Sequence, residues 1–289
     1  MVTERHTITE VLAPQTRIYD YLPGKLETLP SRKGIKKALS KGYVVLNNQT
    51  AFSGDYVKKG DEIMLVSPEK QPFKLFPLKV DVVYEDEYIA VVHKPAGLIT
   101  SGNYYKTLHN CLPYNLTLSN QKDKLVSPLP VHRLDRATSG LVIVAKTYKA
   151  RMVLGEAFEH KTVKKSYYAI VQGYLKAHGV LNQPISGKEA ITYFKTIASV
   201  PCKRNSSLTL VELQPHTGRT HQLRIHLATI GYPIYGDQLH GDPNNTKKNK
   251  GLFLFAFKLA FYHPITNTPL TFELTKPKKF DKYFPNIND

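Results

Sequence analysis

The chain of 289 residues has only two cysteines, Cys111 and Cys202, which lack the close spacing of metal-binding thiolates. We therefore expect neither a disulfide framework nor a zinc–thiolate centre. Long apolar runs are also missing, because the longest, residues 252–257, is far too short to span a bilayer. The first ten residues lack the apolar core of a secretory signal. These absences predict a soluble, cytoplasmic protein.

Acidic residues are scarce relative to basic ones. The 40 lysines and arginines outnumber the 23 acids, which gives a formal net charge of +17 and a pI of about 9.6. Solubility alone would not favour one sign so heavily, so the excess indicates a polyanionic partner, nucleic acid or a membrane surface. A membrane surface would need an amphipathic basic helix with large apolar anchors. The candidate helix over residues 31–41 is too short, so we expect nucleic acid.

Several cofactor and catalytic motifs are absent. The chain has no Gly-x-x-x-x-Gly-Lys loop for a nucleoside triphosphate, and Ser139 lacks the Gly-x-Ser-x-Gly elbow of serine hydrolases. His216, His221 and His226 recur every five residues, a spacing that does not place them on one helical face as in a zinc helix. We therefore expect no metal site.

The segment from about residue 17 to 66 predicts a small α+β domain. Ser31 is a plausible N-cap for a helix that ends at Gly42. Lysines recur every four residues opposite the apolar face, so the helix presents a basic surface. We expect RNA contacts from Arg32, Lys33, Lys36, Lys37 and Lys41. An ordinary solvated face would have the same pattern.

This segment resembles the αL-motif domain, a small RNA-binding module first seen in a small-subunit ribosomal protein. The matching elements are Leu22, the Ser31-Arg32 helix start, Gly42-Tyr43-Val44, Asn47 and residues 59–63. The resemblance implies that the basic helix lies against phosphates, which supply affinity and position more than sequence reading.

Composition shifts predict four segments. They are an N-terminal extension over residues 1–13, the αL-motif domain over 14–67, a proline-containing linker over 68–78 and a larger domain over 79–289, which the resemblance described below implies to be catalytic. In the last, we expect strands at 80–84, 88–92, 141–145, 167–172, 207–213 and 252–261, helices near 150–160 and 220–230, and a loop at 244–250. Strands cluster without regular βαβ alternation, which predicts an α+β fold with a mixed, mainly antiparallel central sheet.

The most informative segment reads His-Arg-Leu-Asp-Arg-Ala-Thr-Ser-Gly, residues 132–140. It places Asp135 between Arg133 and Arg136, just before a β-branched run that predicts a buried strand. Nearby positive charge favours the ionised carboxylate, so Asp135 can act as an anionic nucleophile or base without a metal. Taken alone, however, the pattern fits a structural ion pair better than a catalytic group.

Two later segments change this interpretation. Residues 165–173 predict a strand that carries Tyr167, and residues 213–227 predict a turn that opens a helix carrying Arg224. Together the segments resemble the RluA-type pseudouridine synthases over residues 79–280. The match rests, in the family's order, on His132-Arg133-Leu134-Asp135, Thr138-Ser139-Gly140, Lys165, Tyr167 and residues 217–226. The chain departs from the family at Phe255, where the typical Leu-His-Ala is replaced by Leu-Phe-Ala.

The resemblance implies a pseudouridine synthase fold and an enzyme that isomerises specific uridines. With the αL-motif domain in front, it implies the branch that modifies large-subunit ribosomal RNA. Asp135 would be the catalytic carboxylate, Tyr167 would pack against the target base, and Arg224 would pair with Asp135. Further RNA contacts would come from Arg133, as a wedge in the RNA stack, from Leu223 in the uracil pocket, and from Arg219, Gln222 and Thr138. The isomerisation needs no redox change or energy input, so we expect no cofactor.

Two alternatives remain open from the sequence. The chain could be a transfer-RNA pseudouridine synthase, because a uridine pocket does not specify the RNA. It could also be a non-catalytic RNA-binding or ribosome-assembly factor on the same fold, which predicts that loss of Asp135 would leave its cellular role intact. We expect a monomer.

Overall fold

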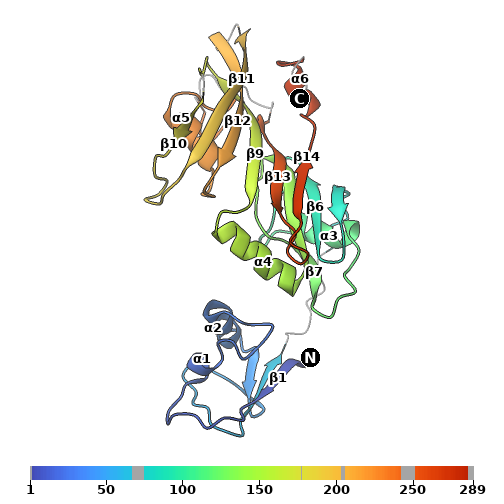
Figure 1. Ribbon diagram of the computed structural model, residues 1–289, viewed down its shortest axis with the longest axis vertical. Coiled ribbons are helices and arrows are strands. Elements are labelled where there is room, and N and C mark those ends of the chain that lie inside the picture. The colour runs from blue at the N-terminus through green and yellow to red at the C-terminus, as the bar shows by residue number, and fades with distance from the viewer. Residues whose placement is uncertain (1, 67–74, 177, 203–205, 242–250, 286–289) are drawn as a thin grey trace. The chain divides into compact units, whose positions relative to one another are not determined.

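The computed structural model describes residues 2–66, 75–176, 178–202, 206–241 and 251–285 (Figure 1). The chain divides into two compact units, Met1–Phe73 and Lys74–Asp289. The predicted loop at 244–250 and most of the predicted linker lie outside the described residues.

The first unit is a small sheet with two helices. Its sheet has the order β1-β4-β2-β3, with β1 (Val2–Thr7), β2 (Val44–Leu46), β3 (Gln49–Thr50) and β4 (Glu62–Val66). Its helices are α1 (Ile18–Tyr21) and α2 (Arg32–Ser40). The side chain of Ser31 accepts a hydrogen bond from the Gly34 N–H, so the predicted cap of α2 is confirmed. Ile35, Ala38 and Leu39 are its buried face.

Strand β1 pairs with β4 along its whole length. The first residues therefore belong to the sheet of this unit, and the prediction of a separate extension over residues 1–13 is wrong for them. The sequence hid this strand because its residues, Val-Thr-Glu-Arg-His-Thr, are mostly polar. Its ladder hydrogen bonds to β4 hold it in place without an apolar pattern.

The second unit is built on a ten-stranded sheet with the order β10-β11-β12-β9-β13-β8-β6-β5 along its main path, with β14 paired to β13 and β7 to β8. The strands are β5 (Asp81–Glu85), β6 (Ile89–Lys94), β7 (Lys124–Pro130), β8 (Ser139–Thr147), β9 (Lys164–Gln172), β10 (His178–Leu181), β11 (Thr192–Cys202), β12 (Ser206–Pro215), β13 (Leu254–Tyr262) and β14 (Pro269–Glu273). The described pairings are antiparallel except for β8 with β13, which confirms the predicted mixed, mainly antiparallel α+β fold.

Four helices pack around this sheet: α3 (Leu108–Asn115), α4 (Tyr148–Glu159), α5 (Gln222–Thr229) and α6 (Lys278–Asp281). Helix α4 contacts β8, and α5 contacts β11 and β12 (Figure 1). Every residue of β8 is buried, because apolar clusters lie on both of its faces. This strand therefore gives a rigid base to the segment that precedes it, residues 132–138.

Strand β11 was not among the strands predicted from the sequence. It is half-exposed along most of its length, and its Thr, Ser, Lys and Pro residues do not alternate with apolar ones. Pairing with β10 and β12 holds it in the sheet. The backbone pairing with β10 and β12 therefore determines that this segment is a strand, because its own residues carry no alternating apolar pattern.

Gly140 lies where β8 meets β13. Its φ is 132°, and a Cβ at this position would collide with the carbonyl oxygen of Ala256, its partner in the parallel pairing. Glycine thus allows two backbones to approach directly behind the Asp135 segment.

We expect Gly140→Ala to lower the free energy of unfolding by at least about 2 kcal/mol, because overpacking and backbone strain add. Gly155→Ala is the matched control, since Gly155 lies in the exposed part of α4 and an added Cβ there meets nothing within 4 Å. It should raise stability by about 1 kcal/mol. Denaturant unfolding of both variants checks this. Equal stability of Gly140→Ala and wild type would contradict the packing argument.

Candidate active site

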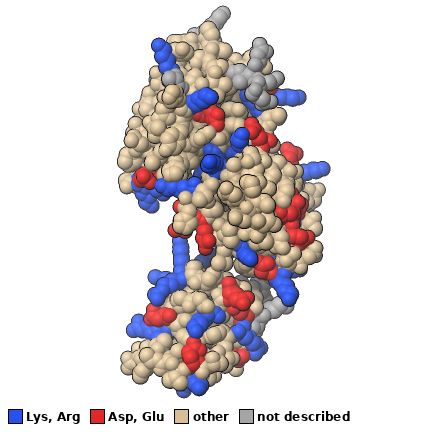
Figure 2. Space-filling view, in the orientation of Figure 1, with Lys and Arg blue, Asp and Glu red and all other residues tan. Residues whose placement is uncertain are grey.

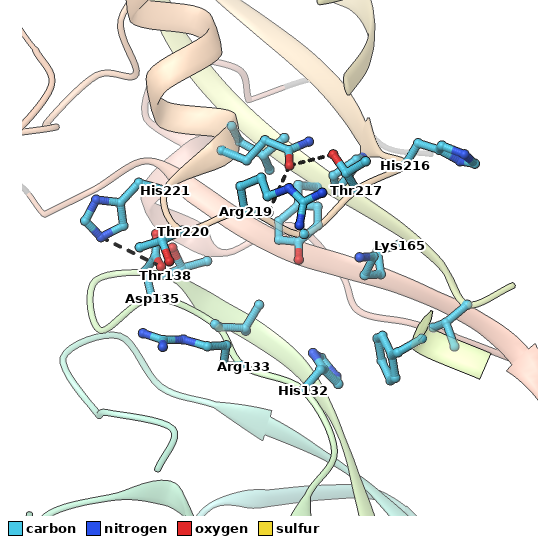
Figure 3. Close-up of a pocket in the computed structure, with 18 of the residues that line it drawn as sticks. His132, Arg133, Asp135, Thr138, Lys165, His216, Thr217, Arg219, Thr220 and His221 are labelled. Atoms are coloured by element: carbon cyan, nitrogen blue, oxygen red, sulfur yellow. Dashed lines mark hydrogen bonds and ion pairs between the residues drawn. The ribbon is translucent and has the colours of Figure 1, made fainter. Parts of the chain in front are cut away.

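A pocket of about 540 Å³ opens in the second unit. Its lining comes from residues 131–138 before β8, from the end of α4 and the start of β9, from residues 215–224, and from Leu254 of β13. All the site residues predicted for the catalytic domain line it: Arg133, Asp135, Thr138, Tyr167, Arg219, Gln222, Leu223 and Arg224. The fold thus brings together segments that are far apart in the sequence (Figure 3).

Asp135 lies in a turn closed by a hydrogen bond from the Thr138 N–H to the Asp135 carbonyl, at 3.0 Å. The residue before it is held by the buried hydroxyl of Thr100. This hydroxyl donates to the Leu134 carbonyl at 2.9 Å and accepts from the Leu134 N–H at 3.1 Å. The backbone on the N-terminal side of the carboxylate is therefore fixed.

The residue after Asp135 is held by Gly97 and Lys94. The Gly97 N–H donates to the Arg136 carbonyl at 2.7 Å. The Lys94 ammonium is fully buried and donates to the carbonyls of Leu98 at 2.7 Å and Arg136 at 3.5 Å. Burial lowers the pKa of Lys94 to about 8, against the opposing effect of the Asp135 charge. No local pattern around residue 94 reveals that this lysine is buried.

Arg224 joins Asp135 to a second carboxylate that the sequence did not indicate. Its Nη1 lies 3.5 Å from Asp135 Oδ2, while Nε and Nη2 donate to the two oxygens of Asp237 at 2.7 and 2.8 Å. The Asp237 side chain is only 1% exposed. The loop that carries Asp237 is visible in the sequence as a Gly- and Pro-containing turn, but no spacing rule connects it to Arg224.

The Arg224–Asp237 pair is held in its charged form. Burial alone would lower the pKa of Arg224, but its hydrogen bonds to Asp237 and the charges of Asp237 and Asp135 raise it. Burial alone would likewise raise the pKa of Asp237, but hydrogen bonds from Arg224 and from the His240 N–H outweigh it and lower that pKa.

The two arginines beside Asp135 in the sequence are not its partners. Among the described residues, no ion pair joins Asp135 to Arg133 or Arg136. Arg136 is exposed and its Nε donates to the Gly97 carbonyl at 3.1 Å, and Arg133 is exposed at the pocket. Side chains of adjacent residues in a turn point in different directions, so the two arginines next to Asp135 in the sequence do not contact its carboxylate. The positive partner of Asp135 comes from α5 instead.

Tyr167 is buried in β9, between Leu213 of β12 and Ala256 of β13. Burial, and then the negative charge of Asp135, raise the pKa of Tyr167 above its ordinary value, so the phenol stays protonated.

His132 fixes the backbone of the neighbouring strand β8. Its Nε2 accepts a hydrogen bond from the Ile143 N–H at 3.0 Å, and burial, followed by the charge of Lys165, lowers the pKa of His132 to about 3.

Gln222 is engaged within the protein. Its amide donates to the Ile191 carbonyl and the Thr192 hydroxyl, and its oxygen accepts from the Thr217 hydroxyl and the Arg219 N–H. A direct contact with RNA would have to break these bonds, so Gln222 shapes the 217–222 loop. Leu223 and Arg219 remain at the pocket, where Arg219 Nε donates to the Glu189 carbonyl at 2.8 Å.

Thr138 belongs to the lining of the pocket, whereas Phe255 belongs to the core beneath it. The Thr138 hydroxyl is buried and has no hydrogen-bond partner within the described residues, and Thr138 lines the pocket. Phe255, where the resembling family typically has histidine, is 1% exposed and packs edge-on against His93 at 5.9 Å. Its neighbour Leu254 lines the pocket. The change at position 255 is therefore a change in the core.

The described residues bring no group of three histidine, cysteine or acidic side chains close enough to hold a metal ion. Every helix in the described part of the chain is too short or too polar to cross a bilayer.

Comparisons with known proteins identify similar chains. The model of the RNA pseudouridylate synthase family matches residues 88–229. An uncharacterized RNA pseudouridine synthase of Aquifex aeolicus is 31% identical, with 88% of each chain covered. The ribosomal large subunit pseudouridine synthase C of Rickettsia felis is 32% identical over 96% of this chain and 99% of that one. The solved human RNA pseudouridylate synthase domain containing 1 has a similar fold, with a TM-score of 0.58 at 22% identity, covering 69% of this chain and 84% of that one.

We expect Asp237→Asn to lower the free energy of unfolding by about 3 kcal/mol near neutral pH, because it leaves Arg224 with a weaker buried partner. The pKa of Asp237 in the folded protein lies below its ordinary value of 3.8. Its contribution is therefore present above about pH 4 and is lost as the pH falls through the folded value.

Urea unfolding at a series of pH values checks this prediction. The difference between wild type and Asp237→Asn should be constant from about pH 5 to 7 and shrink in more acidic solution. Glu273→Gln removes the exposed Lys258–Glu273 pair and should cost less than about 1 kcal/mol. If both variants lowered the free energy of unfolding equally, the buried Arg224–Asp237 pair would stabilise the fold no more than an exposed ion pair.

Proposed function

The chain belongs to the RNA pseudouridine synthase family, and on this premise we propose that it converts specific uridines of large-subunit ribosomal RNA to pseudouridine, with Asp135 as the catalytic carboxylate. The proposal rests mainly on the position of Asp135. Its side chain lines a pocket and faces Arg224, and hydrogen bonds fix the backbone of the residues on either side of it.

The geometry suits the reaction. Isomerisation detaches the uracil from C1′ and reattaches it through carbon 5, so the site must stabilise charge as the glycosidic bond breaks. Because Asp237 already fixes Arg224, the guanidinium needs no reorganisation to face Asp135. Tyr167 lies beside them as a protonated phenol that packs against the base. Leu223 adds an apolar wall.

The target base must leave the RNA stack before it can enter the pocket, which costs a few kcal/mol. Arg133 is exposed at the pocket, where its guanidinium can occupy the space left by the base. Lys161 and Lys165 also line the pocket, and Lys164 and Lys258 line an adjoining hollow of about 440 Å³. Figure 2 shows basic side chains near the junction of α4 and β9. These cations attract the phosphates on either side of the target.

The first unit supplies a second basic surface. The side chains on or beside α2 that were predicted to contact RNA are all exposed: Arg32, Lys33, Lys36, Lys37 and Lys41. Figure 2 shows basic side chains on the surface of this unit. We assign this αL-like unit to non-specific phosphate contacts. The choice of large-subunit RNA over transfer RNA rests on this unit and on the name of the Rickettsia felis relative, because the pocket specifies only uridine.

A non-catalytic role on the same fold is the other candidate. It would not require the carboxylate, the charged Arg224–Asp237 pair and the protonated Tyr167 to converge on one pocket. Mapping pseudouridines in the ribosomal and transfer RNA of cells with and without the gene tests the RNA class directly. A site lost from transfer RNA alone would replace the ribosomal assignment.

We expect Asp135→Asn to abolish pseudouridine formation and to leave RNA binding largely intact, because the change removes only the charge of the carboxylate. Conversion is measured on cellular RNA with purified protein, and binding by titration. Asp81→Asn, at an exposed position of β5, is the control and should behave as wild type. Comparable conversion by Asp135→Asn would exclude the proposed chemistry.

The triple variant Lys33→Ala, Lys36→Ala, Lys37→Ala should weaken RNA binding and flatten its salt dependence. Each lost phosphate contact reduces the slope of log K against log salt by about 0.7–0.9. The control variant Arg5→Ala, Lys25→Ala removes cations of the same unit that are already paired with Glu62 and Glu10, at 3.0 and 2.6 Å. If the triple variant kept the wild-type slope, α2 would not contact RNA.

A further inference from the structure

His221 has an unusual backbone conformation directly before α5. Its φ is 56°, in the left-handed region, and its side chain makes no capping hydrogen bond to the helix. A non-glycine residue in this region is uncommon, and such strain often marks a functional position. The conformation directs the imidazole toward Asp135 (Figure 3).

The His221 ring bridges Asp135 and a second histidine. Its Nε2 lies 3.9 Å from Asp135 Oδ1, and its Nδ1 lies 3.0 Å from His240 Nε2, with the two rings nearly perpendicular at 76°. One of these two facing nitrogens must carry the hydrogen and the other must accept it. When Nδ1 carries it, His221 Nε2 is left as an acceptor that faces the pocket.

The charged groups around this pair are Asp135, Arg224 and Asp237. Asp237 also fixes His240, because its Oδ1 accepts the His240 N–H at 3.1 Å. Burial is the main cause of the lowered pKa of His240. The charges of Arg224 and His221 lower this pKa further, whereas the charges of Asp237 and Asp135 raise it. His240 is therefore neutral in neutral solution, and its Nε2 faces His221 Nδ1.

Pseudouridine formation requires a proton acceptor. When C1′ has bonded to carbon 5, the C5–H bond must break, its electron pair restores the ring double bond, and N1 must gain a proton. Tyr167 is a poor acceptor because it remains protonated. The pocket places an imidazole nitrogen beside Asp135 instead.

We propose that His221 accepts the C5 proton of the rearranged uracil and passes its own Nδ1 proton to His240. This inference rests on the proposed function. In the step, the C5 proton goes to His221 Nε2 and the Nδ1 proton goes to His240 Nε2. N1 takes a proton from water, and the histidine pair returns one to solvent, so no proton is gained or lost overall. The carboxylate of Asp135 stabilises the transient imidazolium.

His221→Asn separates proton transfer from structure. Asparagine is among the residues that tolerate the left-handed conformation, so the backbone before α5 should be kept. Its amide can still face His240 but cannot take up a proton. We expect the single-turnover rate to fall about 10²–10⁴-fold with unchanged RNA affinity, because that is the usual contribution of general acid–base catalysis.

The decisive measurement uses RNA that carries 5-deuterouridine at the target position. In His221→Asn, cleavage of the C5–H bond should become the slowest step, so a primary isotope effect larger than that of wild type should appear. His240→Asn should show a smaller rate loss, because Nε2 of His221 remains. His178→Asn, on exposed β10, is the control and should match wild type.

Two outcomes would overturn the inference: a wild-type rate in His221→Asn, or a slower rate without the larger isotope effect, which would assign His221 a structural role. Failure of the proposed function would differ from both. In that case wild type itself would form no pseudouridine, or Asp135→Asn would remain active.

Discussion

The buried ion pair between Arg224 and Asp237 is the constraint on which the site depends. Two charges taken out of water are costly unless each is well paired, and this pair satisfies that demand with two short hydrogen bonds. The pairing fixes the first turn of α5 against the loop after it. It leaves one guanidinium nitrogen directed at Asp135, and it leaves Asp237 able to hold the backbone of His240. One ion pair thus orients the cation that faces the carboxylate and also holds the backbone of His240, whose ring contacts His221.

The opposite wall of the site is fixed by backbone contacts. Thr100, Gly97 and Lys94 hold the residues on either side of Asp135, and β8 anchors the segment from behind. Neither wall depends on the other for its shape. Asp135 and Arg224 therefore meet as two preformed surfaces, and a base that enters between them finds charges that are already oriented.

The sequence predicts the parts of this protein that local patterns encode. The Ser31 cap of α2, the buried run of β8 and the ordered motifs around Asp135, Tyr167 and Arg224 all lie within short windows. Asp237, Thr100 and Lys94 escaped prediction because their partners lie 13, 34 and 42 residues away in the sequence, beyond the reach of any local pattern. Strand β11 escaped because its half-exposed residues carry no apolar alternation. The motifs therefore predicted residues that line one pocket, and hydrogen bonds between residues far apart in the sequence hold these residues in place.

The separation of Asp135 from its neighbouring arginines has a functional consequence. Had Arg133 paired with Asp135, RNA phosphates would compete with the catalytic carboxylate for the same guanidinium, and binding would disturb the charge that the reaction needs. Instead Arg133 is exposed, while the partner of Asp135 is a buried arginine that is itself anchored by Asp237. RNA can then engage the exposed cation without altering the buried pair. Under the proposed function, these residues therefore have two separate tasks: Arg133 would contact RNA at the surface, and Arg224 would hold the charge of Asp135 within the pocket.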